Sequence, residues 1–193
     1  MDTLLYEFVS KHTRSFDETH GIEHALAVYN NAMLIAQTDY PELDMEIIMY
    51  ASLLHDVRDH KYPESISQVV LEDFVYTAVH FSTANIILAI IDNVSFSKEV
   101  KGLRKQIDDE TTKYLDIISD ADKLEALGEV GIKRCIGFTH MKGGNVPDDV
   151  IKHCHDKLLR LYTNGYIKTP SGRKLALPLH KEVERYVLEN GHS

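Results

Sequence analysis

The chain has 193 residues, 44% of them hydrophobic, which predicts a single domain over residues 1–193 with one buried core. Its 21 Lys and Arg against 30 Asp and Glu give a formal net charge of −9, which argues against nucleic-acid binding and favours a small-molecule ligand. No apolar run reaches the roughly 20 residues of a membrane span, and no signal-peptide pattern is present, so we expect a cytoplasmic protein.

Apolar residues recur along the chain at spacings of three and four, without sustained alternation, and this predicts an all-α fold. A single compact multi-helix bundle is the simplest arrangement. A homodimer is compatible with the sequence, although no heptad seam indicates one. After a first helix around Leu4 to Val9, we expect helices at about residues 22–38, 44–57, 65–79, 82–93, 111–118, 123–138, 148–162 and 172–188.

Two adjacent metal-binding side chains, His55 and Asp56, end the otherwise apolar segment that begins at Ile47. Burying an imidazole and a carboxylate beside a core costs several kcal/mol unless they are paired or bind a metal. The imidazole nitrogen and the carboxylate oxygen can reach one ion, although a plain surface helix terminus is the alternative. His24 upstream and Asp122 downstream are further candidate ligands.

His24 and Asp120 each have a simpler interpretation than metal binding. His24 is expected in the first turn of the second helix, facing the core with Val28, and by itself it indicates only a hydrogen-bonded histidine. His20 would lie on the preceding loop. Asp120 suits the N-cap of the following helix, which leaves Asp122 as the acid better placed to bind a metal.

Taken in order, His24, His55-Asp56 and Asp122 resemble the H…HD…D signature of the HD-domain metal-dependent phosphohydrolase superfamily. Residues 94–97, 120–128 and 131–134 resemble a bacterial-type subgroup that includes nucleotide pyrophosphohydrolases. The resemblance covers roughly residues 20–188, and it implies an all-α HD domain. The metal ligands that it implies are His24, His55, Asp56 and Asp122.

The implied cofactor is one divalent transition metal ion, with Mn expected and Co, Ni, Fe, Zn or Mg as alternatives. Such an ion keeps positions open for water and a phosphate oxygen, lowers the pKa of the water and neutralises charge on the phosphorus. Asp59, where relatives often carry Glu, is the candidate to orient or deprotonate the attacking water. Its alternative is a solvent-facing acid in a charged loop.

Positive side chains close in sequence to these motifs are candidates for binding the substrate phosphate, although ordinary surface charges are the alternative. Lys123 is favoured because it directly follows a predicted ligand. The other candidates are Lys61, Arg58 and Arg134, with His20 as a hydrogen-bond donor to phosphate.

The predicted function is therefore a pyrophosphohydrolase acting on a nucleoside triphosphate or diphosphate. A 5′-nucleotidase-type phosphomonoesterase with the same site is an alternative. A di-iron oxygenase of the same superfamily would need His60 and His80 as additional ligands. A protein that binds a phosphorylated ligand without catalysis is a further alternative.

Overall fold

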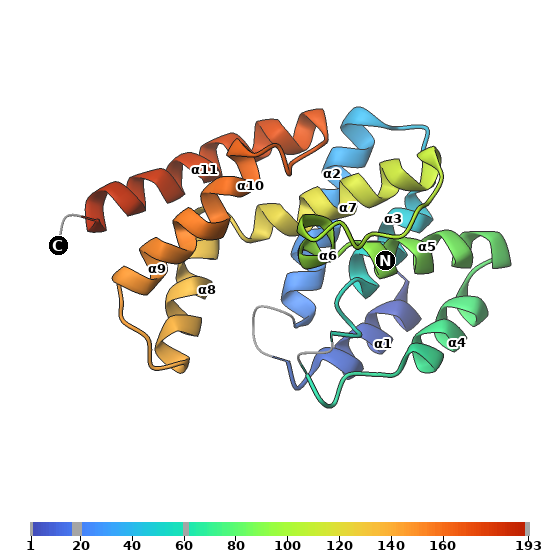
Figure 1. Cartoon of the computed structure of the whole chain (residues 1–193). Coiled ribbons are helices and arrows are strands. Elements are labelled where there is room, and N and C mark those ends of the chain that lie inside the picture. Colours follow the sequence, from blue (N-terminus) through green and yellow to red (C-terminus); the bar gives the residue numbers. More distant parts are fainter. Residues whose placement is uncertain (1, 17–20, 60–61, 192–193) are drawn as a thin grey trace. The chain divides into compact units, whose positions relative to one another are not determined.

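The computed structural model describes residues 2–16, 21–59 and 62–191. Within these ranges the chain forms helices and no strand, which confirms the predicted all-α fold (Figure 1). No helix in the described ranges is both long and apolar enough to cross a membrane. The chain divides into two compact units, Met1–Ser119 and Asp120–Ser193, and the prediction of a single domain stays a prediction.

The first unit is built around α3 (Met45–Leu54), a short helix that is buried on nearly all sides. Helices α1, α2 and α5 pack against it, and α4 packs against α5. Because α3 is apolar over most of its surface, its C-terminal end lies in the core of this unit. The bounds of the other helices are α1 (Thr3–Thr13), α2 (Ile22–Asp39), α4 (Gln68–Ala78), α5 (Phe81–Asn93), α6 (Phe96–Val100) and α7 (Asp109–Glu125).

The second unit begins within the last turns of α7 and ends in the long helix α11 (Pro170–Asn190). Helix α11 packs against α8 (Gly128–Met141) and α10 (Leu159–Thr163). Its first turn has favourable capping, because the Thr169 hydroxyl accepts the Gly172 N–H at 3.1 Å and Pro170 occupies the first helical position. Between α8 and α10 lie α9 (Asp148–His153) and a π-helical turn, η1 (Cys154–Leu158).

The helix boundaries differ from the prediction at functionally relevant places. Helix α3 ends at Leu54 rather than residue 57, so the His-Asp pair lies in the turn that follows it. Helix α7 continues to Glu125 instead of ending at residue 118. The polar Ser119 and Asp120 suggested an end, but the buried Ala121 and Leu124 continue the apolar face of the preceding turns.

Two further differences concern neighbouring segments. The helix expected from residue 123 starts at Gly128, whose φ of 68° lies in the left-handed region that glycine adopts without strain. The short helix α6 was not predicted, since five residues are too few to show a periodic pattern.

Candidate metal centre

His55 is held at the C-terminal end of α3 by the backbone of its own helix. Its Nδ1 lies 2.7 Å from the carbonyl oxygen of Ser52, and the His55 side chain is only 1% exposed. Because a carbonyl oxygen can only accept, Nδ1 carries the hydrogen and donates it. In the neutral ring this leaves the lone pair of Nε2 available to a metal, as is usual for histidine ligands.

His24 reaches the same place from α2. Its Nε2 lies 3.7 Å from Asp56 Oδ2, and the Nε2 of His55 lies 3.3 Å from the same oxygen. The two rings meet edge to face, with centroids 5.3 Å apart. Two imidazoles and one carboxylate therefore converge, and Asp56 is 28% exposed whereas both histidine side chains are buried. This is a donor set that suits a divalent transition metal, with solvent access from the Asp56 side.

The predicted catalytic acid, Asp59, follows the turn that carries the His-Asp pair. It is only 8% exposed, and its carbonyl oxygen accepts the N–H of Tyr62 at 3.0 Å. Its burial differs from the alternative of a solvent-facing acid, while its role toward water stays a prediction. His20, His60 and Lys61 lie outside the described residues.

Asp122 lies within α7, three residues from the end of that helix. It follows Ile118 by four residues, so the two share a helix face, and Ile118 is fully buried. Asp122 itself is half-buried. The helix thus presents the Asp122 carboxylate on the face that carries the buried Ile118, and the assignment of Asp122 as a ligand stays a prediction.

The residues of this signature fall within one family match. The family model described as HD domain matches residues 21–127, a range that includes His24, His55, Asp56 and Asp122. The chain belongs to the HD-domain family. The resemblance to the HD-domain superfamily is therefore confirmed, and membership of this family implies divalent-metal binding.

Two curated proteins are similar to this chain over most of its length. The uncharacterized protein YpgQ of Bacillus subtilis is 29% identical over 174 residues, which cover 87% of this chain and 81% of YpgQ. An uncharacterized protein of Acanthamoeba polyphaga mimivirus is 29% identical over 152 residues, covering 70% of this chain and 59% of the viral protein.

Solved structures are also similar to this chain over nearly all of its length. The crystal structure of YpgQ in complex with ADP has a TM-score of 0.76 at 26% identity, covering 96% of this chain and 93% of YpgQ. A Bacillus thuringiensis protein described as an HD-superfamily hydrolase has a TM-score of 0.72 at 23% identity, over 96% of this chain and 92% of its own, and it supports the HD fold alone.

The surroundings of Asp120 in this HD domain indicate a structural role that differs from the predicted N-cap. It lies inside α7, so the expectation that it caps a helix N-terminus is wrong. Its buried carboxylate accepts the N–H of Lys168 at 2.9 Å and, from Thr169, the N–H at 2.7 Å and the hydroxyl at 2.8 Å. Burial raises the pKa of this carboxyl, and the hydrogen bonds offset that effect only in part. The sequence could not show these partners, which lie about fifty residues further along the chain.

Two predicted phosphate-binding residues also have contacts within the second unit. The ammonium of Lys123 donates to the carbonyl of Tyr166 at 2.8 Å, and Lys123 is 3% exposed. The guanidinium of Arg134 donates to the carbonyl of Glu125 at 3.3 Å and lies 3.7 Å from its carboxylate. Both contacts fix the start of this unit, and binding of substrate by either residue stays a prediction.

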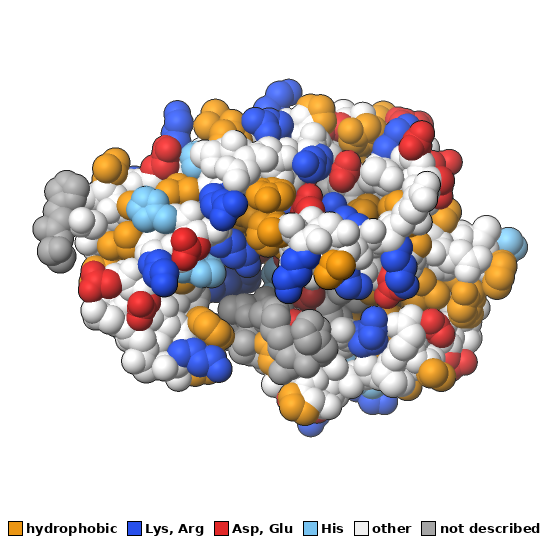
Figure 2. Space-filling model, in the orientation of Figure 1, with side chains coloured by type: hydrophobic (Ala, Val, Ile, Leu, Met, Phe, Trp, Pro, Cys, Tyr) orange, Lys and Arg blue, Asp and Glu red, His pale blue; other side chains and the backbone are white. Residues whose placement is uncertain are grey.

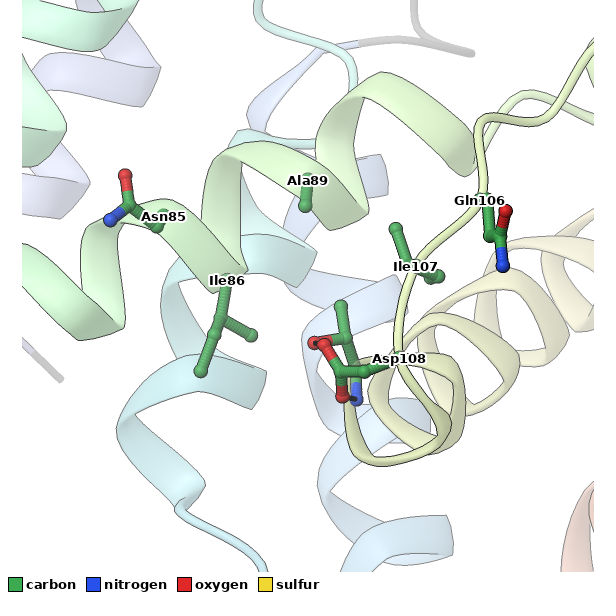
Figure 3. A pocket seen from close by; sticks show the side chains of 7 residues that line it. Asn85, Ile86, Ala89, Gln106, Ile107 and Asp108 are labelled. Atoms are coloured by element: carbon green, nitrogen blue, oxygen red, sulfur yellow. Dashed lines mark hydrogen bonds between the residues drawn. The ribbon is translucent and has the colours of Figure 1, made fainter.

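A pocket of about 540 Å³ lies in the first unit between α5 and the segment that leads into α7 (Figure 3). Ile86, Ala89 and Ile107 contribute its apolar lining. Asp108 uses both carboxylate oxygens to accept the N–H and hydroxyl of Thr111, at 2.8 and 2.7 Å, and these bonds lower the pKa of Asp108. The lining contains no histidine and no cationic side chain, so this pocket lacks the groups for metal or phosphate chemistry.

Proposed function

We propose that this protein is a divalent-metal-dependent phosphohydrolase that cleaves a nucleoside triphosphate or diphosphate. The observation that carries the proposal is the convergence of the His24 and His55 Nε2 atoms on one oxygen of Asp56. The HD-domain family supports the hydrolase class. Crystallised YpgQ holds ADP, and that ligand of a similar protein supports a nucleotide as the substrate here.

The proposed ligands are His24, His55, Asp56 and Asp122, which together offer nitrogen and carboxylate oxygen donors. This donor set suits Mn, and also Co, Ni, Fe or Zn. When bound, the ion supplies Lewis-acid chemistry at the phosphorus and a water of lowered pKa.

The protein side chains have separate tasks in this mechanism. The Ser52 carbonyl holds the His55 ring in one orientation and one tautomer. Asp56, which is more exposed than the two histidines, is proposed to lie where substrate and solvent enter. Asp59, buried and three residues beyond Asp56, is proposed to accept the proton of the attacking water.

The oxygenase alternative loses support from the surroundings of His80. The ring Nδ1 of His80 lies 2.9 Å from the Ser82 hydroxyl and accepts the Ser82 N–H at 3.4 Å, so the side chain caps the N-terminus of α5. His80 is exposed. A histidine with this capping role has a structural explanation that needs no second metal ion.

The test measures the release of phosphate and pyrophosphate by protein that has been stripped of metal and reconstituted with Mn. Nucleoside tri-, di- and monophosphates form the substrate panel, with elemental analysis of the protein as purified. We expect pyrophosphate from triphosphates only when metal is present. Phosphate released from monophosphates would instead identify a nucleotidase, and no release from any substrate would contradict the proposed hydrolase.

A further inference from the structure

Asp92, in the last turn of α5, gathers three cationic side chains in the first unit. Its carboxylate lies 3.5 Å from Arg58 Nη2 and accepts from Lys105 Nζ at 2.7 Å, while Lys98 Nζ donates to its backbone carbonyl. We refer to Arg58, Asp92, Lys98 and Lys105 as the Asp92 cluster. Figure 2 shows Lys and Arg side chains over the part of the surface where α5 and α6 lie in Figure 1.

Some of the nearby cations have a structural explanation. Carbonyl groups at the end of a helix lack intrahelical partners, and Lys98 supplies a donor to one of them. Arg104 donates to the Asn93 carbonyl at 2.9 Å, and its charge is matched by Glu99 at 3.3 Å. The Lys105 N–H bonds the Asn93 side chain at 2.6 Å. These contacts fix the segment after α6 onto α5 and so determine where the Lys105 side chain begins.

Arg58 and Lys105 are left with capacity to bind an anion. Their side chains are 37% and 72% exposed, and they share the single carboxylate of Asp92. Burial raises the pKa of Asp92, but Lys105, Lys98 and Arg58 together lower it by more. The pKa therefore lies below its usual value, and the carboxylate stays ionised. Three cations against one anion leave the Asp92 cluster with two excess positive charges, in a chain whose net charge is −9.

The position of the cluster connects it with the HD motif. Arg58 follows Asp56 by two residues, within the same turn after α3. A guanidinium offers several donors in a planar arrangement that matches phosphate oxygens, and the Asp92 contact occupies one edge of it. An exposed cation in the turn that carries His55 and Asp56 could meet a phosphate chain that enters from solvent.

We propose that Arg58 and Lys105 bind the polyphosphate of the substrate, with Asp92 holding both side chains in position. The two excess charges of the cluster favour a chain of two or three phosphates over a single phosphate group. The link to catalysis depends on the proposed hydrolase function, because it assumes that substrate phosphorus lies at the HD motif. Binding of the phosphate chain itself does not depend on turnover.

The experiment measures the binding of inorganic tripolyphosphate to metal-free protein by isothermal titration calorimetry, at low and at physiological ionic strength. Arg58→Gln and Lys105→Gln each remove one charge of the cluster. Lys133→Gln is the matched control, because Lys133 lies on α8 in the other unit, is 77% exposed and pairs only loosely with Glu129 at 3.7 Å. All four proteins are compared by circular dichroism to show that they are folded.

We expect each cluster variant to bind tripolyphosphate about tenfold more weakly, as the loss of one charge-assisted hydrogen bond implies. The Lys133→Gln control should stay within about twofold of the original protein. Equal weakening in all three variants would overturn the proposal, as would the absence of tripolyphosphate binding by the unaltered protein. Metal-dependent nucleotide hydrolysis, measured separately, distinguishes the two claims: binding without hydrolysis contradicts only the proposed function.

Discussion

Asp56 and Asp120 are both acids beside apolar helix residues, yet their surroundings differ in kind. Asp120 is fully buried, and its carboxylate accepts hydrogens from two backbone amides and a hydroxyl. Asp56 is partly exposed and faces two imidazole nitrogens. Donors that carry hydrogens compensate the charge of a buried carboxylate, whereas the lone pairs of neutral ring nitrogens can share a bound cation with the carboxylate. The first environment is structural, and the second is consistent with the proposed role of Asp56 as a metal ligand.

The largest effect expected from this difference is that of Asp56→Ala. Retained metal should fall to background, and nucleotide turnover should fall by about a thousandfold or more, because a catalytic metal supplies several kcal/mol of charge stabilisation. His55→Ala should behave in the same way. Elemental analysis and product release measure the two effects.

The same variant also tests the structural side of the comparison. In metal-free protein, Asp56→Ala should change the free energy of unfolding in urea by no more than about 1 kcal/mol, since the Asp56 side chain is partly exposed and its truncation leaves little buried space unfilled. A variant that keeps both metal and turnover would contradict the assignment of Asp56 as a ligand.

Asp59→Asn should separate catalysis from metal binding. We expect turnover to fall by about a hundredfold or more, which is the usual contribution of a general base, while the metal content stays unchanged. The measurements are product release at saturating substrate and elemental analysis. Asp73→Asn, at an exposed position of α4, is the matched control and should leave both quantities unaltered. Loss of the metal in Asp59→Asn would instead make Asp59 a ligand.

Asp120→Ala should have the opposite profile to Asp56→Ala. Removing the carboxylate leaves three donors at the start of α11, two of them buried, without their acceptor, which should lower the free energy of unfolding by about 3 kcal/mol. Urea unfolding of metal-free protein measures this loss. Thr169→Val removes the hydroxyl donor to Asp120 and the acceptor of the Gly172 N–H, but it leaves the two backbone donors paired and should cost less than Asp120→Ala. Unchanged stability in Asp120→Ala would show that these hydrogen bonds contribute little.

The sequence predicted the parts of this fold and site that depend on local pattern. Periodicity along α2 and α11 predicted both helices to within about two residues, because each presents one apolar face. The His-Asp pair was recognisable because it ends an apolar run. His24 required the resemblance, since one histidine in an apolar stretch has many structural explanations.

Other features depend on contacts between distant segments and left no local signal. The hydrogen bonds from Lys168 and Thr169 to Asp120 span about fifty residues, and the capping of α5 by the Lys98–Lys105 segment links two different elements. The absence of a local signal for such contacts also explains why the prediction of Asp120 as an N-cap was wrong. A polar residue between two apolar stretches indicates a helix end unless its buried partners are known.

Gly172→Ala is the smallest of the proposed changes to the surroundings of Asp120. A Cβ at this position would lie 2.5 Å from the Thr169 hydroxyl and 2.9 Å from Asp120 Oδ2, so it would push apart the groups that start α11. Overpacking of this kind costs about 1–3 kcal/mol in the free energy of unfolding.

Gly137→Ala in α8 is the control, because its Cβ meets nothing within 4 Å and the change should stabilise the helix by up to about 1 kcal/mol. Opposite signs in urea unfolding would show that close packing at Asp120, rather than helix propensity, requires Gly172. Stabilisation by both changes would mean that the start of α11 can shift to accept the methyl group.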